Sequence, residues 1–167
     1  MKQAVAVLVV SIFGICSTGF SQESDILNFL QVNTEFCTAG QPTSEQLSKL
    51  KQDGIRTVLN LRVPSEHDAA AEEAAVRALG MNYLNIPIAG ANVEDSQVTT
   101  FLTFTDNEDN RPMFIHCASA NRVGALWMIR RVIRDGWNTT DAETEAGEIG
   151  LSSPALLAFA RQYIEAH

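Results

Sequence analysis

Hydrophobic positions along this chain form short apolar runs that alternate with longer segments of helical spacing. The apolar runs are rich in β-branched and aromatic residues, and they predict strands over residues 34–37, 55–61, 81–88 and 113–116. The segments of helical spacing predict helices over residues 43–53, 66–79, 95–107 and 122–135, two more that begin near Thr140 and Ser153, and a short one over 24–30.

Local signals support several of these boundaries. Thr43 with Gln46 three residues later forms a capping box at the start of the 43–53 helix, and Gly54 ends that helix. Ser65 is the expected cap of the helix 66–79, which Gly80 terminates.

Regular alternation of strands and helices predicts an α/β domain. Right-handed crossovers between such units give a mostly parallel sheet of about four strands with helices on both faces. Ligands of such sheets bind beyond the carboxyl ends of the strands. The polar residues that follow the predicted strands are Gln41, Arg62, Glu66, His67, Glu94, Asp95 and Cys117.

The first residues form an export signal rather than part of the domain. Lys2 precedes an apolar run over residues 4–15, and small residues lead to Ser21. This arrangement predicts a secretory signal peptide over residues 1–21, followed by a single domain over residues 22–167. We therefore expect a periplasmic or secreted protein with no stable membrane insertion after cleavage, because the apolar run is too short to span a bilayer.

The net charge of the chain excludes one class of partner. The chain carries 12 Lys and Arg against 20 Asp and Glu, a net charge of −8, and no basic stripe. Nucleic acid is therefore not an expected partner.

Two cysteines remain after signal cleavage. We expect Cys37 to be packed in the core and Cys117 to be free and reactive. A disulfide between them is the alternative, because an exported protein meets an oxidising compartment.

The most informative segment runs from residue 112 to residue 127. A buried strand ends at His116, Cys117 opens a short polar loop, and a helix begins near Arg122. A strand–loop–helix turn directs backbone N–H groups and the positive end of a helix dipole at one place, which lowers the pKa of a thiol there. An arginine at the end of the loop supplies a planar fork for two oxygens of an anion. The segment therefore predicts covalent chemistry on an oxyanion.

The segment HCASANRVGALW resembles the signature of the protein tyrosine phosphatase superfamily. It is most similar to the bacterial beta-lactamase-hydrolase-like, phosphatase-like branch. That branch also carries segments similar to residues 38–42, TAGQP, and residues 58–62, VLNLR. The resemblance covers residues 34–135 approximately.

This resemblance implies a protein tyrosine phosphatase-like fold and a two-step phosphoryl transfer without metal or cofactor. Cys117 would be the nucleophile that forms a phosphocysteine, Arg122 the oxyanion clamp and His116 a supporting residue. The acid is expected to be Asp95 or Glu94, ahead of Glu66 or His67. The residues expected to bind the phosphate ester or other oxyanion substrate are Ala118, Ser119, Ala120, Asn121, Arg62 and Gln41.

Several positions depart from the pattern of well-characterised tyrosine phosphatases. Four residues rather than five separate Cys117 from Arg122, which turns the arginine by roughly 100° and shifts it by about 1.5 Å. Ala120 stands where relatives usually have glycine, and Val123 stands where many carry a hydroxyl. The stretch 83–91 contains no carboxylate that could act as the acid.

Two alternatives follow from these departures. The short loop matches rhodanese-type sulfurtransferases, in which the cysteine carries a persulfide and no acid is needed. The third hypothesis is a non-catalytic oxyanion-binding module that keeps the loop but has lost turnover.

Overall fold

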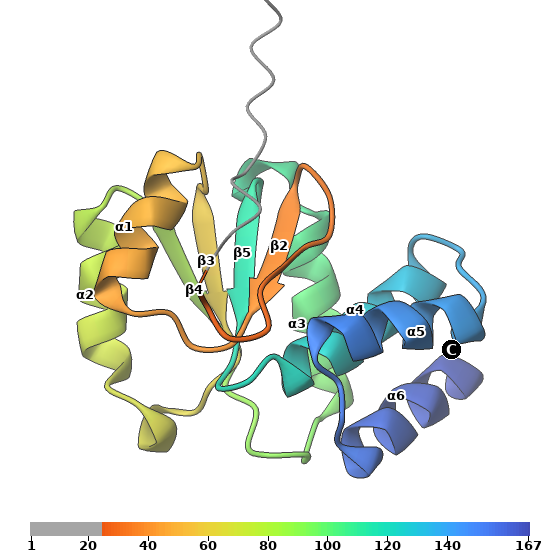
Figure 1. The fold of residues 1–167 in the computed structure, drawn as a ribbon. Coiled ribbons are helices and arrows are strands. Elements are labelled where there is room, and N and C mark those ends of the chain that lie inside the picture. The colour runs from red at the N-terminus through yellow and green to blue at the C-terminus, as the bar shows by residue number, and fades with distance from the viewer. Residues whose placement is uncertain (1–24) are drawn as a thin grey trace, which may run out of the picture.

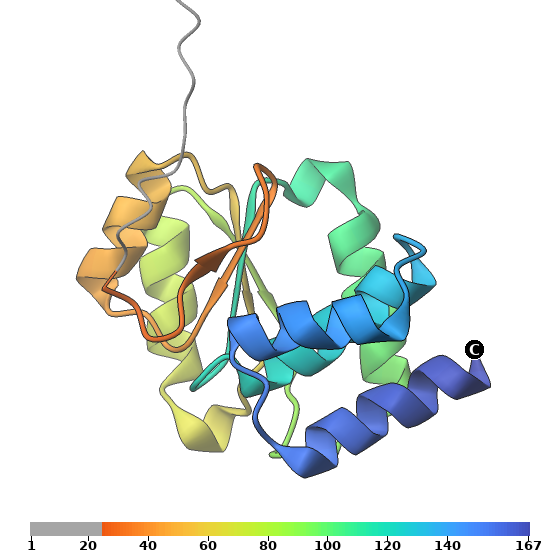
Figure 2. The ribbon, with the colours of Figure 1, turned by 45° about the vertical axis from the view of Figure 1, so that its right-hand side comes forward.

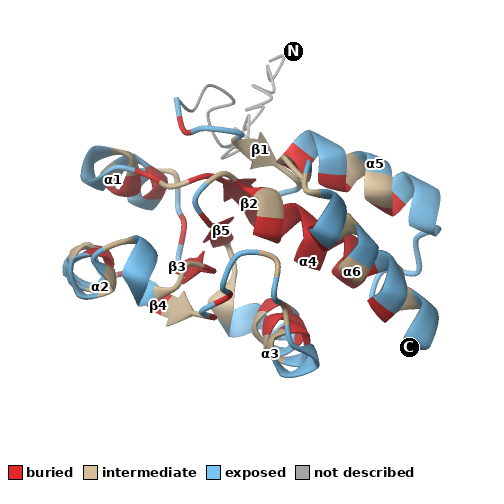
Figure 3. Cartoon of the chain, turned by 90° about the horizontal axis from the view of Figure 1, so that it is seen from below, coloured by how far each residue is buried: buried red, intermediate tan, exposed pale blue. Residues whose placement is uncertain are grey.

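A sheet at the centre of the domain is covered by helices on both faces in the computed structural model, which describes residues 25–167. Helices α1 and α2 lie on one face, and α3 to α6 lie on the other (Figures 1 and 3). The predicted signal peptide, residues 1–21, lies outside the described residues. No helix among residues 25–167 is long and apolar enough to cross a bilayer.

The sheet has five strands, one more than the sequence predicts. Their bounds are β1 Leu30–Gln31, β2 Phe36–Ala39, β3 Thr57–Asn60, β4 Asn82–Asn85 and β5 Met113–His116. The order across the sheet is β1-β2-β5-β3-β4, and all neighbours pair in parallel except β1 with β2. The α/β class and the parallel sheet are therefore confirmed.

The prediction of a helix over residues 24–30 is wrong. This segment forms a turn and then the short antiparallel strand β1, in which Leu30 pairs with Thr38. The tertiary environment decides this segment, because the edge of β2 offers a ladder of backbone partners that helical spacing alone does not reveal.

Six helices follow the predicted order. Their bounds are α1 Ser44–Gln52, α2 Ala69–Ala78, α3 Asp95–Asp106, α4 Asn121–Ile133, α5 Thr139–Ile149 and α6 Pro154–Ala166, with short 3-10 turns η1 at Pro64–Glu66 and η2 at Glu108–Asn110. The capping box of Thr43 and Gln46 is confirmed, as is the start of α6 at Ser153, whose side chain caps the helix. Ser65 is not the cap of α2, because it lies inside η1 and Asp68 caps the helix instead.

Each face of the sheet has its own hydrophobic core. Cys37 belongs to the core beneath α1 and α2, whereas Cys117 belongs to the core beneath α3 and α4. Successive side chains of a strand point to opposite faces, so the register of β2 and β5 separates the two thiols. Both cysteines are free, and the structure does not contain the disulfide that the sequence leaves open.

Helix α4 lies between the sheet and the two C-terminal helices (Figure 2). Its residues from Arg122 to Arg131 are all buried, so it is enclosed on every side. Gly124 allows α5 to approach closely, since a β-carbon there would lie 2.7 Å from the carbonyl oxygen of Ala146. This packing fixes the N-terminus of α4, where the loop after β5 ends.

Candidate active site

The loop between β5 and α4 spans only residues 117–120, and neighbouring segments hold its carbonyl groups. The backbone N–H of Gln41 donates to the carbonyl oxygen of Ala118 at 3.2 Å, and Asn28 Nδ2 donates to that of Ser119 at 3.1 Å. Gly40 makes this contact possible, because a β-carbon at residue 40 would lie 2.9 Å from the Ala118 oxygen. The carbonyl oxygens of the loop are therefore bound to the segments that flank it.

The N–H groups of the same loop remain available. Those of Ala118, Ser119, Asn121 and Arg122 donate to no other group within residues 25–167. The turn that exposes them needs Ala120 in the left-handed conformation, with φ of 63°, where alanine costs more than glycine. Free donors at the N-terminus of a 13-residue helix favour the binding of an anion.

Cys117 and Arg122 lie together at the base of this loop, and both side chains are buried. Burial by itself would lower the pKa of Arg122, but its hydrogen bonds to Glu66 and its interaction with the Cys117 sulfur raise that pKa above the ordinary range. The guanidinium is therefore a permanent cation beside the thiol.

Glu66 in η1 holds the guanidinium of Arg122. Nη1 and Nη2 donate to the two carboxylate oxygens of Glu66, each at 2.7 Å, and Nη1 also donates to the carbonyl oxygen of Ile88 at 2.7 Å. The hydrogen bonds from Arg122 are the main cause of the lowered pKa of Glu66, so this carboxyl is ionised. The hydrogen bonds of Arg122 to Glu66, Ile88 and Leu61 all use Nη1 or Nη2.

His116 points to the opposite face of the sheet from Cys117, where it contacts Glu72 of α2. The two side chains are linked at 2.9 Å between His116 Nε2 and Glu72 Oε1, and both are buried. Burial opposes ionisation of Glu72, but the hydrogen bonds from His116 and Gln41 lower its pKa below the ordinary value. The His116 ring is therefore hydrogen-bonded to a buried carboxylate.

Sequence reasoning missed Glu72. It lies in an alanine-rich helix next to Glu73, and only its spacing of four residues from the buried Val76 indicates that it faces the sheet. The spacing is a weak signal, because most glutamates on such helices are exposed to solvent.

Arg62 and Gln41 lie beside the loop, at the ends of β3 and β2. Arg62 Nη1 donates to Gln41 Oε1 at 2.6 Å, a second nitrogen of Arg62 donates to the carbonyl oxygen of Glu66, and Gln41 Nε2 donates to Glu72 at 2.7 Å. With His67 they border a hollow of about 310 Å³ between α1 and α2. The two predicted substrate-binding residues are thus brought together, and their polar atoms bind each other and these glutamates.

The side chain of Asn121 faces away from the loop. Its Oδ1 accepts hydrogen bonds from the backbone N–H groups of Ser152 and Ser153, both at 2.9 Å. Asn121 therefore ties α4 to the start of α6, and only its backbone N–H is left for an anion.

The predicted acids lie apart from the cysteine. Asp95, exposed in the first turn of α3, borders a hollow formed by α6 residues that include Phe159 and Tyr163. Glu94 is the N-cap residue of α3, and its backbone N–H donates to Gln97 Oε1 at 2.9 Å. Neither carboxylate contacts Cys117 or Arg122 within the described residues, and the carboxylate that does contact Arg122 belongs to Glu66.

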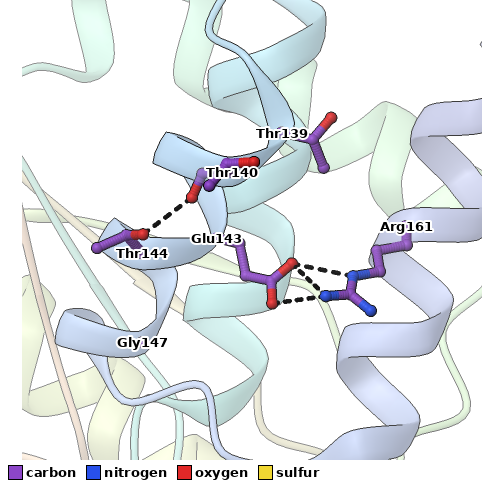
Figure 4. Close-up of a pocket in the computed structure, with 6 residues that line it drawn as sticks. All are labelled: Thr139, Thr140, Glu143, Thr144, Gly147 and Arg161. Atoms are coloured by element: carbon purple, nitrogen blue, oxygen red, sulfur yellow. Dashed lines mark hydrogen bonds and ion pairs between the residues drawn. The ribbon is translucent and has the colours of Figure 1, made fainter.

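Other features of the described residues do not form a second reactive site. A hollow of about 440 Å³ lies between α5 and α6, where Glu143 and Arg161 form a two-pronged ion pair (Figure 4). Both of these side chains are partly exposed. No group of three or more His, Cys, Asp or Glu side chains within residues 25–167 could hold a metal ion.

Comparison with known proteins gives a consistent result. Residues 10–154 match the family described as DSP-PTPase phosphatase fused to NAD+ kinase. A beta-lactamase hydrolase-like protein of Xylella fastidiosa (strain Temecula1) is 27% identical over 124 residues, which are 72% of this chain and 28% of that protein. The chain thus spans little more than a quarter of the length of that relative.

Solved structures share the fold. A DUF442 protein of Shewanella putrefaciens CN-32 is 26% identical, with a TM-score of 0.71 that covers 85% of this chain and 93% of the other. The core catalytic domain of the PP-IP phosphatase SIW14 from S. cerevisiae, in complex with citrate, is 24% identical, with a TM-score of 0.70 that covers 84% of this chain and 85% of the other. The chain therefore belongs to the family of DSP-PTPase phosphatases fused to NAD+ kinase, and its fold is that of the protein tyrosine phosphatase-like phosphatases.

Proposed function

We propose that the protein is a cysteine-dependent phosphatase. The observation that carries this proposal is the pairing of a buried thiol and guanidinium, Cys117 and Arg122, below a loop in which the N–H groups of Ala118 and Ser119 have no partner among the described residues. Fixed donors and a fixed cation stabilise the negative charge that spreads over a phosphoryl group in transfer. Membership of a phosphatase family supports the same reaction.

The reaction would proceed in two displacements. The thiolate of Cys117 attacks phosphorus, an S–P bond forms, and the P–O bond to the leaving group breaks. Arg122 and the loop N–H groups hold the three other oxygens. Water then attacks phosphorus, releases inorganic phosphate and returns the thiolate.

The leaving oxygen requires a proton unless it is a weak base. Glu66 is ionised in its pair with Arg122, so it holds no proton to give. Asp95 stays our candidate for the acid, with Glu94 next to it, and a substrate would have to extend to the first turn of α3 to reach them. We therefore propose a substrate with an acidic leaving group, such as an aryl phosphate or a phosphoanhydride, because such groups leave with little protonation.

A paired assay tests this function. Phosphate release from 4-nitrophenyl phosphate is measured beside sulfur transfer from thiosulfate to cyanide, for the wild type, Cys117→Ser and Arg122→Ala. We expect phosphate release only, abolished in Cys117→Ser and reduced at least about 100-fold in Arg122→Ala. Sulfur transfer without phosphate release would favour the rhodanese-type reaction that the four-residue spacing suggests.

Two further measurements complete the design. If both reactions are absent and phosphate binding is lost in Arg122→Ala, the protein is an oxyanion-binding module.

To test the acid, Asp95→Asn and Glu94→Gln are compared on phenyl phosphate and 4-nitrophenyl phosphate. Loss of an acid lowers the rate more for phenyl phosphate, whose leaving group is the stronger base.

A further inference from the structure

Glu72 is the centre of a buried polar network on the face of the sheet opposite Cys117. Its carboxylate is bonded to Asn60 of β3, Gln41 after β2 and His116 of β5, at distances of 2.7 to 2.9 Å. Asn60 and His116 are the last residues of β3 and β5, and Gln41 follows β2; these are the three central strands of the sheet. One side chain of α2 thus ties together the strand ends that carry the active site.

The hydrogen positions of this network are determined by groups that can only donate. The backbone N–H of Arg62 donates to Asn60 Oδ1 at 2.8 Å, so Asn60 must present its NH₂ group to Glu72. The guanidinium of Arg62 donates to Gln41 Oε1, so Gln41 also presents its NH₂ group to Glu72.

The same reasoning fixes the tautomer of His116. Ionised Glu72 can only accept, so the proton of the His116–Glu72 bond lies on Nε2. The other ring nitrogen, Nδ1, is buried and has no partner among the described residues. His116 Nδ1 lies next to its own backbone, one residue before Cys117.

Other titratable groups around Glu72 do not replace His116. His67 Nδ1 lies 3.2 Å from the carbonyl oxygen of Val63, and His67 Nε2 lies 2.8 Å from Asn60 Nδ2. His67 Nε2 is 3.9 Å from Glu72, too far for a hydrogen bond like that of His116. Tyr83 lies behind Asn60, and burial raises its pKa to about 12, so it stays neutral.

We propose that Glu72 is a positioning residue for the cysteine loop: it keeps the proton of His116 on Nε2 and holds the side chain of Gln41, whose backbone N–H donates to the Ala118 oxygen of that loop. This inference deepens the proposed function and rests on it for its catalytic consequence. The tautomer itself can be measured without any turnover.

The substitution Glu72→Gln removes the negative charge and one hydrogen-bond acceptor of the side chain but keeps its size. A glutamine at position 72 puts an NH₂ group where one carboxylate oxygen stood. In place of Oε1 this group faces Asn60 and His116, and in place of Oε2 it faces the NH₂ group of Gln41, so at least one of these residues loses its acceptor. Glu73→Gln is the matched control, because Glu73 is adjacent and partly exposed, and within the described residues its carboxylate is paired with Arg77 alone.

Imidazole ¹⁵N shifts and the rate of Cys117 alkylation by iodoacetamide are measured across pH. In the wild type and Glu73→Gln we expect the Nε2–H form of His116. In Glu72→Gln we expect the lost hydrogen bond to give a fall of at least about threefold in alkylation rate at pH 7 and a loss of about tenfold in kcat on 4-nitrophenyl phosphate. A purely structural role would lower stability without changing the alkylation rate or its pH profile.

Each outcome decides the inference. An Nδ1–H form in the wild type overturns it without any variant, which covers the case that Glu72→Gln does not fold. Equal alkylation profiles in Glu72→Gln and Glu73→Gln also overturn it. If the wild type releases no phosphate from 4-nitrophenyl phosphate, the proposed function fails, but the tautomer and alkylation results still decide the role of Glu72.

Discussion

Arg122 and Glu66 form a two-pronged ion pair, with both Nη atoms of the arginine 2.7 Å from the two oxygens of the carboxylate. The pair connects the first turn of α4 to the η1 turn after β3, which are 56 residues apart in the chain. A side chain as long as arginine reaches a defined position only when its head is held, and Glu66 with the carbonyl oxygen of Ile88 holds it.

The first prediction concerns this pair. In Glu66→Gln the guanidinium keeps its bond to Ile88 but loses its anionic partner, so we expect kcat/KM on 4-nitrophenyl phosphate to fall about tenfold. We also expect the free energy of unfolding at pH 7 to fall by about 2 kcal/mol, because a largely buried charge loses its counter-charge. Urea unfolding and steady-state kinetics measure the two effects.

The stability effect should depend on pH in one direction. The folded-state pKa of Glu66 lies below the ordinary value of 4.5, so the pair stabilises the fold above that value. The contribution is lost as the pH falls through the lower folded-state pKa. The gap between the wild type and Glu66→Gln should therefore close in acid, and a gap that stays constant from pH 7 to pH 3 would contradict this account.

A second prediction tests the close contact at Gly40. A β-carbon in Gly40→Ala would lie 2.9 Å from the Ala118 oxygen and push the loop carbonyl out of place, so we expect phosphatase activity to fall at least tenfold. Gly147→Ala is the control, since residue 147 has open space around it on α5 (Figure 4). There alanine should raise stability by up to about 1 kcal/mol and leave activity unchanged.

The third prediction concerns the two thiols. Burial and the charge of Asp53 raise the pKa of Cys37 far above its ordinary value, so this thiol should not react in the folded protein. Cys117 lies beside Arg122 and should react. Iodoacetamide followed by peptide mass analysis should label residue 117 alone at pH 7, and residue 37 only after unfolding. Native labelling of Cys37, or none in either position, would contradict the proposed arrangement.

The fourth prediction concerns the anchor at Asn121. Asn121→Ala leaves the N–H groups of Ser152 and Ser153 without their acceptor, so we expect a loss of about 2 kcal/mol in unfolding free energy together with reduced activity. Asn138→Ala removes a comparable cap from α5 and should cost about 1 kcal/mol with activity retained. Equal activity losses in the two variants would show that the anchor has no specific connection with the loop.

The fifth prediction concerns export. If residues 1–21 are a signal peptide, expression of the full chain in a bacterium should yield a periplasmic or secreted protein that begins at Gln22, as intact mass would show. The substitution Leu8→Arg interrupts the apolar run and should leave the uncut chain in the cytoplasm. Recovery of an uncut wild-type chain would contradict the prediction.

The sequence by itself determined the alternation of strands and helices, the parallel sheet and the pairing of Cys117 with Arg122 in one turn. These features depend on periodicity and on residues a few positions apart, and such short-range patterns can be read directly. The cap of α1 and the start of α6 belong to the same class, since each is a local contact between a side chain and the next turn.

Only the tertiary structure decided which groups meet at the ends of the strands. His116 and Glu72 are 44 residues apart, and Asn121 lies 31 and 32 residues from its two partners. Such contacts depend on how whole helices pack against the sheet, and the pattern around any one of these residues is compatible with a solvated side chain. For the same reason β1 was mistaken for a helix: its identity as a strand comes from the edge of β2 and not from its own residues.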